Sequence, residues 1–133
     1  MIIEPKTPTG KGPAEWFTGD VWLDVIAAPK ADGQRANLNR VRFTPGARTA
    51  WHSHDLGQTL HITEGVALLG TRDGTVIVAR PGETVYTPPG EEHWHGATPT
   101  DFMEHLAVYD TSSEPPLGAN WLEHVTDEDY NRR

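Results

Sequence analysis

The sequence of 133 residues contains no cysteine, so disulfide bonds, thiolate metal ligands and cysteine nucleophiles are excluded. It also has no uninterrupted apolar run approaching the ~20 residues that a membrane-spanning helix needs. Its first stretch, MIIEPKTPTGKGPAEW, lacks the basic region, apolar core and cleavage site of a secretory signal. We therefore expect a cytoplasmic protein with no membrane partner.

Basic residues are also scarce. Eleven Lys and Arg stand against nineteen Asp and Glu, which gives a formal net charge of −8. A surface of this sign repels phosphate backbones, so nucleic acid is not an expected partner. The length suits one domain with a substantial core and is too short for two.

Long helical periodicity is absent before the C-terminus, and short β-rich segments separated by turns take its place. Residues 21–28, 36–43 and 101–110 each match a strand pattern. Asp73-Gly74 lies between two β-rich runs and predicts a tight hairpin with a type I′ turn. Thr126 begins a segment that is suited to cap a short final helix. Frequent strands and turns predict an all-β sandwich or barrel.

Composition divides the chain into three regions. Residues 1–19 are predicted to form an N-terminal arm, because their first half is rich in Pro, Thr and Gly and has no periodicity. Residues 20–110 hold the predicted strands and form the barrel. Residues 111–133 are predicted to form a linker followed by the short helix.

Four of the seven histidines fall in two short glycine-bounded segments. His52 and His54 lie in the first, and His93 and His95 lie in the second. Residues two apart on a strand point to the same face, so each pair would present two imidazoles in one direction. Imidazoles gathered on a rigid sheet favour a divalent transition metal. The alternative is a set of polar surface residues that align by chance.

The two segments resemble the motifs of the cupin superfamily. The first matches G-x5-HxH-x3-E-x6-G, and the second matches G-x5-PxG-x2-H. Two positions depart from the pattern: Gln58 stands where cupins usually have Glu, and Ala97 stands where the second motif often ends in Asn. The matching positions are Gly46, His52, His54, Gln58 and Gly65 in the first motif and Gly82, Pro88, Gly90 and His93 in the second.

A closer resemblance links the chain to the small bacterial cupin hydroxynitrile lyases, which depend on manganese and cleave or form cyanohydrins. The similar segments are GKGPAEWFTG (10–19), PGARTAWHSHDLGQTL (45–60), PGEEHWHGATPT (89–100) and WLEHVTDEDY (121–130). The resemblance implies a single-domain jelly-roll β-barrel, a small-molecule substrate and Mn²⁺ as the cofactor. Fe²⁺, Zn²⁺ and Ni²⁺ are the alternatives, because histidine-rich sites also accept these ions.

The predicted metal ligands are His52, His54 and His93, with Gln58 as a fourth through its amide oxygen. A neutral Gln cancels none of the ion's charge, whereas Glu would cancel one unit. The ion would then remain a strong Lewis acid and would be less suited to redox cycling. The alternative is that Gln58 only hydrogen-bonds beside the site.

His105 and His95 are the candidate catalytic groups. In the hydroxynitrile lyases the histidine that matches His105 is thought to act as the base, and the resemblance carries that role to His105. His95 shares the face of His93 by strand alternation. A hydrogen-bonded core histidine is the competing interpretation for His105. By contrast, His61 is predicted to point outward and His124 to lie on the surface.

The predicted substrate pocket is lined by Asn39, Val41, Phe43 and Tyr109. Asn39 and Tyr109 depart from the lyase pattern, and Tyr109 adds bulk that would hinder a large aromatic substrate. Trp51 and Trp94 are candidates for the cavity wall as well, but aromatic residues in a barrel more often belong to the core.

Three functions follow from these features. The first is a hydroxynitrile lyase, the second is an oxygen-using cupin of dioxygenase type, and the third is a non-catalytic, metal-dependent binder of small molecules. Gln58 favours the first over the second. We also expect a homodimer, with the N-terminal arm or a sheet face at the contact, because a small open barrel leaves strand edges exposed.

Overall fold

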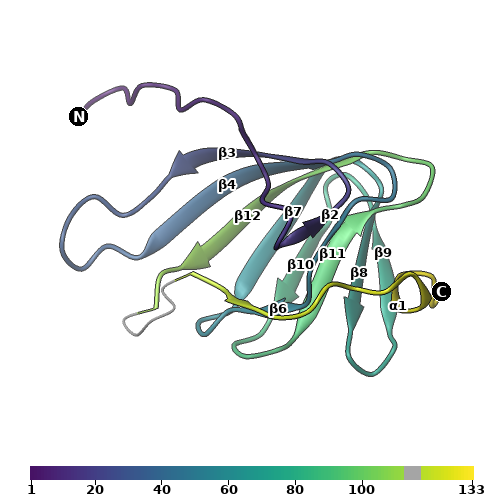
Figure 1. The fold of residues 1–133 in the computed structure, drawn as a ribbon. Coiled ribbons are helices and arrows are strands. Elements are labelled where there is room, and N and C mark those ends of the chain that lie inside the picture. Colours follow the sequence, from purple (N-terminus) through teal and green to yellow (C-terminus); the bar gives the residue numbers. More distant parts are fainter. Residues whose placement is uncertain (113–117) are drawn as a thin grey trace.

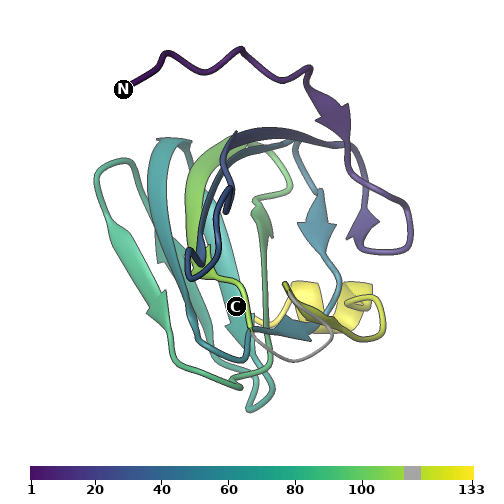
Figure 2. The ribbon, with the colours of Figure 1, turned by 90° about the vertical axis from the view of Figure 1, so that its left-hand side faces the viewer.

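The computed structural model describes residues 1–112 and 118–133, which form two curved antiparallel sheets (Figure 1). Figure 2 shows the sheets curving around a common axis. The all-β prediction is therefore confirmed. The strands are β1 Gly10–Lys11, β2 Phe17–Thr18, β3 Val21–Ala27, β4 Ala36–Phe43, β5 Arg48–Thr49, β6 His52–Ser53, β7 Gln58–Gly65, β8 Ala67–Thr71, β9 Val76–Ala79, β10 Thr84–Thr87, β11 His93–Ala97, β12 Met103–Asp110 and β13 Asn120–Trp121, and the helix is α1 Asp127–Tyr130.

One sheet has the order β1-β3-β4-β12-β7-β10. Its central strand β12 alternates as predicted, with Met103, His105 and Ala107 buried and the residues between them more exposed. His105 pairs with Val41 on β4, so the inward faces of these neighbouring strands coincide. Period-two alternation therefore places a histidine among apolar residues on the inner face.

The other sheet has the order β13-β6-β11-β5-β2, with β8 joined to β11 and β9 joined to β8. Its strand β11 is buried along its whole length. His93, His95 and Ala97 share one face by alternation, and Trp94 belongs to a second apolar cluster with Trp51, Leu68, Val125 and Tyr130. The C-terminal segment thus covers the face of β11 opposite to the histidines.

The motif glycines lie where the backbone turns sharply: Gly65 is the last residue of β7, and the other three lie in turns between strands. Gly46, Gly65, Gly82 and Gly90 have φ values of 81°, 74°, 90° and 78°, in the left-handed region that favours glycine. At Gly65 a Cβ would lie 1.8 Å from the carbonyl oxygen of Phe102. The backbone conformation of these turns therefore requires the glycines that bound the two motifs, and the turns bring the histidine segments together.

The hairpin between β8 and β9 is confirmed, but its predicted turn type is wrong. A type I′ turn needs positive φ at both central residues. Among the described residues no non-glycine has positive φ, so only Gly74 does here, at 89°. The amide of Gly74 donates to the carbonyl of Thr71, and the amide of Thr71 donates to that of Thr75. The loop is one residue longer than a two-residue turn, with Gly74 in its last position.

Short strands near both ends of the chain pair with the sheets. β1 and β2 fall within residues 1–19, yet β1 pairs with β3 and β2 pairs with β5. Residues before β1 run past β3 (Figure 1), where the hydroxyls of Thr7 and Thr9 donate to the carbonyl of Val25 and to the carboxylate of Asp24. Residues 113–117 of the predicted linker lie outside the described residues, and β13 then pairs with β6. None of the described helical segments is long and apolar enough to cross a membrane.

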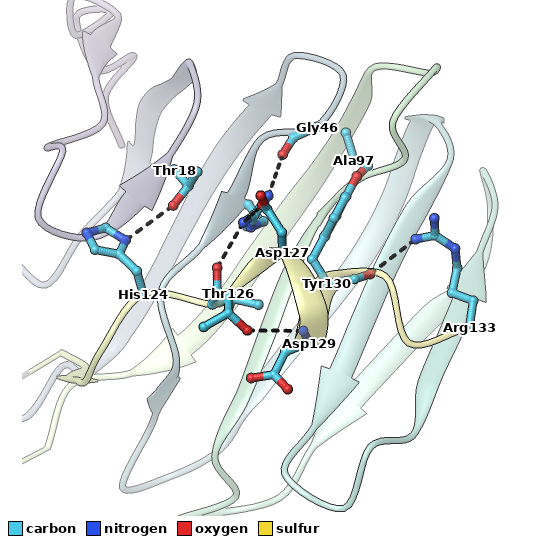
Figure 3. A network of polar contacts seen from close by, with 11 residues as sticks. Thr18, Gly46, Ala97, His124, Thr126, Asp127, Asp129, Tyr130 and Arg133 are labelled. Carbon is cyan, nitrogen blue, oxygen red and sulfur yellow. Dashed lines mark hydrogen bonds and ion pairs between the residues drawn. The ribbon is translucent and has the colours of Figure 1, made fainter.

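The predicted final helix is present as α1. Thr126 is its N-cap, and the side chain of Thr126 accepts a hydrogen bond from the amide of Asp129 at 3.1 Å (Figure 3). The buried ring of Tyr130 anchors the helix, and its hydroxyl donates to the carbonyl of Ala97 on β11 at 2.6 Å. A four-residue helix has little stability of its own, so this packing is what holds it in place.

Candidate metal centre

A cavity of about 510 Å³ opens between the two sheets. Its wall is largely apolar, and it includes histidines from β6 and β11 of one sheet and from β12 of the other. The lining residues are Trp16, Phe17, Leu23, Val25, Asn39, Val41, Thr49, His52, His54, Gln58, His95, His105, Ala107, Tyr109, Gly118, Ala119 and Trp121. A concave apolar site with a few converging polar groups is the usual form of a small-molecule site.

The three motif histidines are oriented by backbone carbonyls. The Nδ1 atoms of His52 and His93 lie 3.0 and 2.9 Å from carbonyl oxygens two residues earlier in the chain, and Nδ1 of His54 lies 3.1 Å from the carbonyl of Gly118. A carbonyl oxygen can only accept, so each Nδ1 carries the proton. A neutral ring then has its lone pair on Nε2, which is the form that binds a metal.

All three rings are held neutral at pH 7. Burial lowers the pKa of His93 to about 4. Burial, and then repulsion from His93 and His54, keeps the pKa of His52 well below its usual value. Burial also lowers the pKa of His54. These sites therefore do not need to lose protons before a cation binds near neutral pH.

The ring centroid of His52 lies 4.3 Å from that of His93 and 5.2 Å from that of His54. Gln58, at the start of β7, places its Oε1 3.1 Å from Nε2 of His93. With the proton of His93 on Nδ1, both of these facing atoms are acceptors. A cation between them would satisfy both, so the residues present fit a divalent metal.

The most compact group of nitrogens differs from the predicted ligand set. Among the described residues, ligand atoms of His52, His93 and His95 lie within 4.8 Å of one another, and these three form a candidate metal site. His54 is outside this group, but its Nε2 is buried and has no hydrogen-bond partner. The fold thus brings all four predicted ligands together with His95, and which of them bind the ion stays a prediction.

His95 and His105 form a hydrogen-bonded imidazole pair next to this group. Nε2 of His105 lies 2.9 Å from Nδ1 of His95, so one ring donates and the other accepts. The other nitrogens, Nε2 of His95 and Nδ1 of His105, are buried without hydrogen-bond partners. Burial lowers the pKa of His105 to about 3; burial, and then repulsion from His105 and His52, lowers that of His95. The pair is neutral and has nitrogen atoms available to a ligand.

Three of the four predicted pocket residues, Asn39, Val41 and Tyr109, line the cavity. Phe43 does not. It is the last residue of β4, is 1% exposed, and packs its ring edge-on against Phe17 at 6.2 Å between centroids. Its centroid lies 5.4 Å from that of His105. Phe43 therefore packs against the rings of His95 and His105 and does not form the wall of the cavity.

Other histidines and aromatic residues lie where the sequence indicated. Nδ1 of His61 contacts the hydroxyl of Thr84 at 2.9 Å in an exposed position, and His124 is exposed. Trp51 and Trp94 pack in the second apolar cluster and are not among the residues lining the cavity.

The cavity also contains residues that the sequence did not predict there. Trp121 stacks on the ring of His52 with a centroid distance of 4.6 Å, and Trp16 stacks on Trp121 at 5.1 Å. Both tryptophans come from segments near the chain ends. The position of Trp121 depends on the pairing of β13 with β6, and that of Trp16 on the pairing of the adjacent β2 with β5; no local sequence pattern gives a signal for either pairing.

Comparisons with known proteins agree with this geometry. The (R)-mandelonitrile lyase of Granulicella tundricola is 47% identical over 124 residues, which are 93% of this chain and 92% of that protein. A crystal structure of a cupin-like protein from Thermotoga maritima has a TM-score of 0.82 and 35% identity, over 98% of this chain and 95% of that one. The polyketide cyclase RemF from Streptomyces resistomycificus, at 22% identity, covers 83% of this chain and 75% of its own with a TM-score of 0.65, and it supports the fold alone.

The family model described as a cupin domain matches residues 39–109, which include both histidine segments and the strand that carries His105. This match and the relative that is 47% identical over almost the whole chain lead to one conclusion. The chain belongs to the cupin family.

Proposed function

We propose that the protein is a metal-dependent hydroxynitrile lyase, which converts a cyanohydrin into a carbonyl compound and hydrogen cyanide. The observation that carries the proposal is the neutral His95–His105 pair beside the group of candidate metal ligands in one apolar cavity. The similarity to a protein named (R)-mandelonitrile lyase supports it. Mandelonitrile is therefore the first substrate to test.

His52, His54, His93 and Gln58 would hold the ion, for which we propose Mn²⁺. When bound there, a divalent ion supplies Lewis-acid stabilisation of negative charge on the substrate oxygen. Because Gln58 brings no charge to the site, the three neutral imidazoles and the amide would leave the ion fully dipositive. This favours polarisation of a hydroxyl group over the activation of oxygen.

The imidazole pair would transfer the proton. An unpartnered ring nitrogen of the pair accepts the hydroxyl proton of the cyanohydrin, the bond between carbon and the nitrile carbon breaks, and the carbonyl double bond forms. The electron pair of the broken bond leaves with cyanide, which then takes the proton from the pair to give hydrogen cyanide. The hydrogen bond between His95 and His105 lets the two rings share the added charge.

The apolar wall would orient the carbon skeleton of the substrate and exclude water. Tyr109 narrows the cavity, because its ring centroid lies 5.0 Å from that of His54. The stacked rings of Trp16 and Trp121 offer a flat surface on another part of the wall. A substrate with one planar apolar group would fit these surfaces, and a bulkier group on the side of Tyr109 would be disfavoured.

The test is cyanide release from mandelonitrile by manganese-loaded protein, measured together with oxygen consumption and metal content. His105→Ala is expected to lower the rate by ~10²–10⁴, the usual contribution of a positioned acid–base group, with the metal content unchanged. His61→Ala is the matched control, because His61 contacts Thr84 on β10 and does not line the cavity, and it should retain the wild-type rate.

Full activity in His105→Ala would move the base role to His95. Absence of cyanide release from every cyanohydrin tested, at full metal occupancy, would contradict the lyase proposal. Oxygen consumption by the same sample would then favour the dioxygenase type of cupin.

A further inference from the structure

The C-terminal segment, residues 118–133, lines part of the cavity with its first residues and contacts two of the predicted metal ligands. β13 pairs with β6, and in this register Trp121 lies opposite His52. The carbonyl of Gly118 accepts the hydrogen bond from Nδ1 of His54. Both histidines of the first motif are thus contacted by residues more than sixty positions later in the chain.

This segment is fixed by contacts on the far side of the sheet. The guanidinium of Arg48 on β5 donates to the carbonyl of Val125 at 2.9 Å and to the carboxylate of Asp127 at 2.8 Å. The hydroxyl of Tyr130 donates to Ala97 (Figure 3). Val125 and Tyr130 are 2% and 4% exposed. These buried contacts hold the segment in one position relative to β6 and β11.

The ring of His52 is consequently constrained in two ways. Its Nδ1–H donates to a backbone carbonyl at 3.0 Å, which sets the direction of the ring nitrogens. Its face packs on Trp121 with an interplanar angle of 29°. On its other side Trp121 stacks almost parallel on Trp16, at 4°. The stack of three rings leaves His52 little freedom to rotate away from His93.

We propose that Trp121 is a positioning residue of the metal centre, which holds the His52 imidazole in its ligating orientation by ring stacking. The inference rests on the proposed function only in taking His52 as a ligand. The groups behind metal-bound imidazoles typically change metal affinity by ~10–100-fold when they are removed. A flat aromatic ring is required for this role, and apolar bulk alone would not orient the imidazole.

The experiment uses Co²⁺ as the probe, because its visible absorption reports ligand geometry and calorimetry gives its affinity. Trp121→Leu keeps an apolar side chain without a ring, and Trp121→Phe keeps a ring. We expect Trp121→Leu to weaken Co²⁺ binding ~10-fold or more and to alter the spectrum. Trp121→Phe should stay within about threefold of wild type with a similar spectrum. Trp22→Leu, a half-exposed tryptophan on β3 outside the residues lining the cavity, is the matched control.

Equal affinity and an unchanged spectrum in Trp121→Leu would overturn the inference, as would equal losses in the Leu and Phe variants or a wild type that does not bind Co²⁺. A substitution that only destabilised the fold, at Trp22 or at Trp121, would lower the unfolding midpoint of that variant. It would leave the spectrum of the bound Co²⁺ unchanged. If the variants behave as expected and wild-type protein loaded with Mn²⁺ releases no cyanide, the lyase proposal fails while the role of Trp121 stands.

Discussion

Lowering the pH from 7 to 5 is expected to destabilise the metal-free protein through its buried histidines. Five of the seven histidines have pKa values lowered by burial, namely His52, His54, His93, His95 and His105. In the unfolded chain these side chains return to a pKa near 6.5. Below that pH the unfolded state binds protons that the folded state excludes, so folding stability falls as the pH falls.

Two of these residues give the magnitude. The pKa of His93 is lowered to about 4 and that of His105 to about 3, so both stay neutral in the folded protein at pH 5. Each of these histidines then lowers the free energy of unfolding by about 2 kcal/mol between pH 6.5 and pH 5, because each of the ~1.5 pH units corresponds to ~1.36 kcal/mol. Together they remove about 4 kcal/mol from a total stability that is typically ~5–15 kcal/mol.

Urea unfolding followed by tryptophan fluorescence at pH 7, 6 and 5 measures this loss. The interval lies above the range in which unfolded carboxylates gain protons, near ~4, so the histidines dominate it. His105→Leu should reduce the pH-dependent loss by about 2 kcal/mol. A free energy of unfolding that varies by less than about 1 kcal/mol from pH 7 to 5 would refute the reasoning.

Three further outcomes are expected. Gln58→Glu should tighten Mn²⁺ binding in calorimetry and slow cyanide release, because the added charge retains the ion and weakens its pull on oxygen; no change in either would show that Gln58 is not a ligand. Tyr130→Phe should cost about 1–2 kcal/mol in denaturant unfolding by leaving the Ala97 carbonyl unpaired, and an unchanged midpoint would contradict this. Light scattering should give a dimer mass, since Trp22 and Ile26 are exposed near the N-terminal arm; a monomer mass at micromolar concentration would exclude the dimer.

Local patterns were enough to predict much of the fold and of the site. The HxH spacing put His52 and His54 together, and alternation put His105 on the inner face of β12. The motif glycines predicted turns, and Gly65 shows why no other residue fits there. These features depend on neighbours within a few residues, so they can be read from a single sequence.

Features that depend on distant pairing were missed. Trp121 contacts His52 only because β13 pairs with β6, and no periodicity in either segment encodes that register. Phe43 lies on the same inward face of β4 as Val41, but it is the buried last residue of that strand and does not line the cavity. Strand alternation predicts which face of the sheet a side chain occupies. How far that side chain lies from the cavity depends on how the two sheets pack against each other.

The covering of β11 by residues near the C-terminus has a consequence for the order in which the protein matures. The ribosome finishes both histidine motifs before it adds Trp121, Val125 and Tyr130, so a nascent chain can form the sheet carrying His93 while one face of that sheet is still bare. The stack on His52 forms only after Trp121 has emerged and β13 has paired with β6. Capture of the ion by an oriented His52 would then come later than the synthesis of the two histidine motifs.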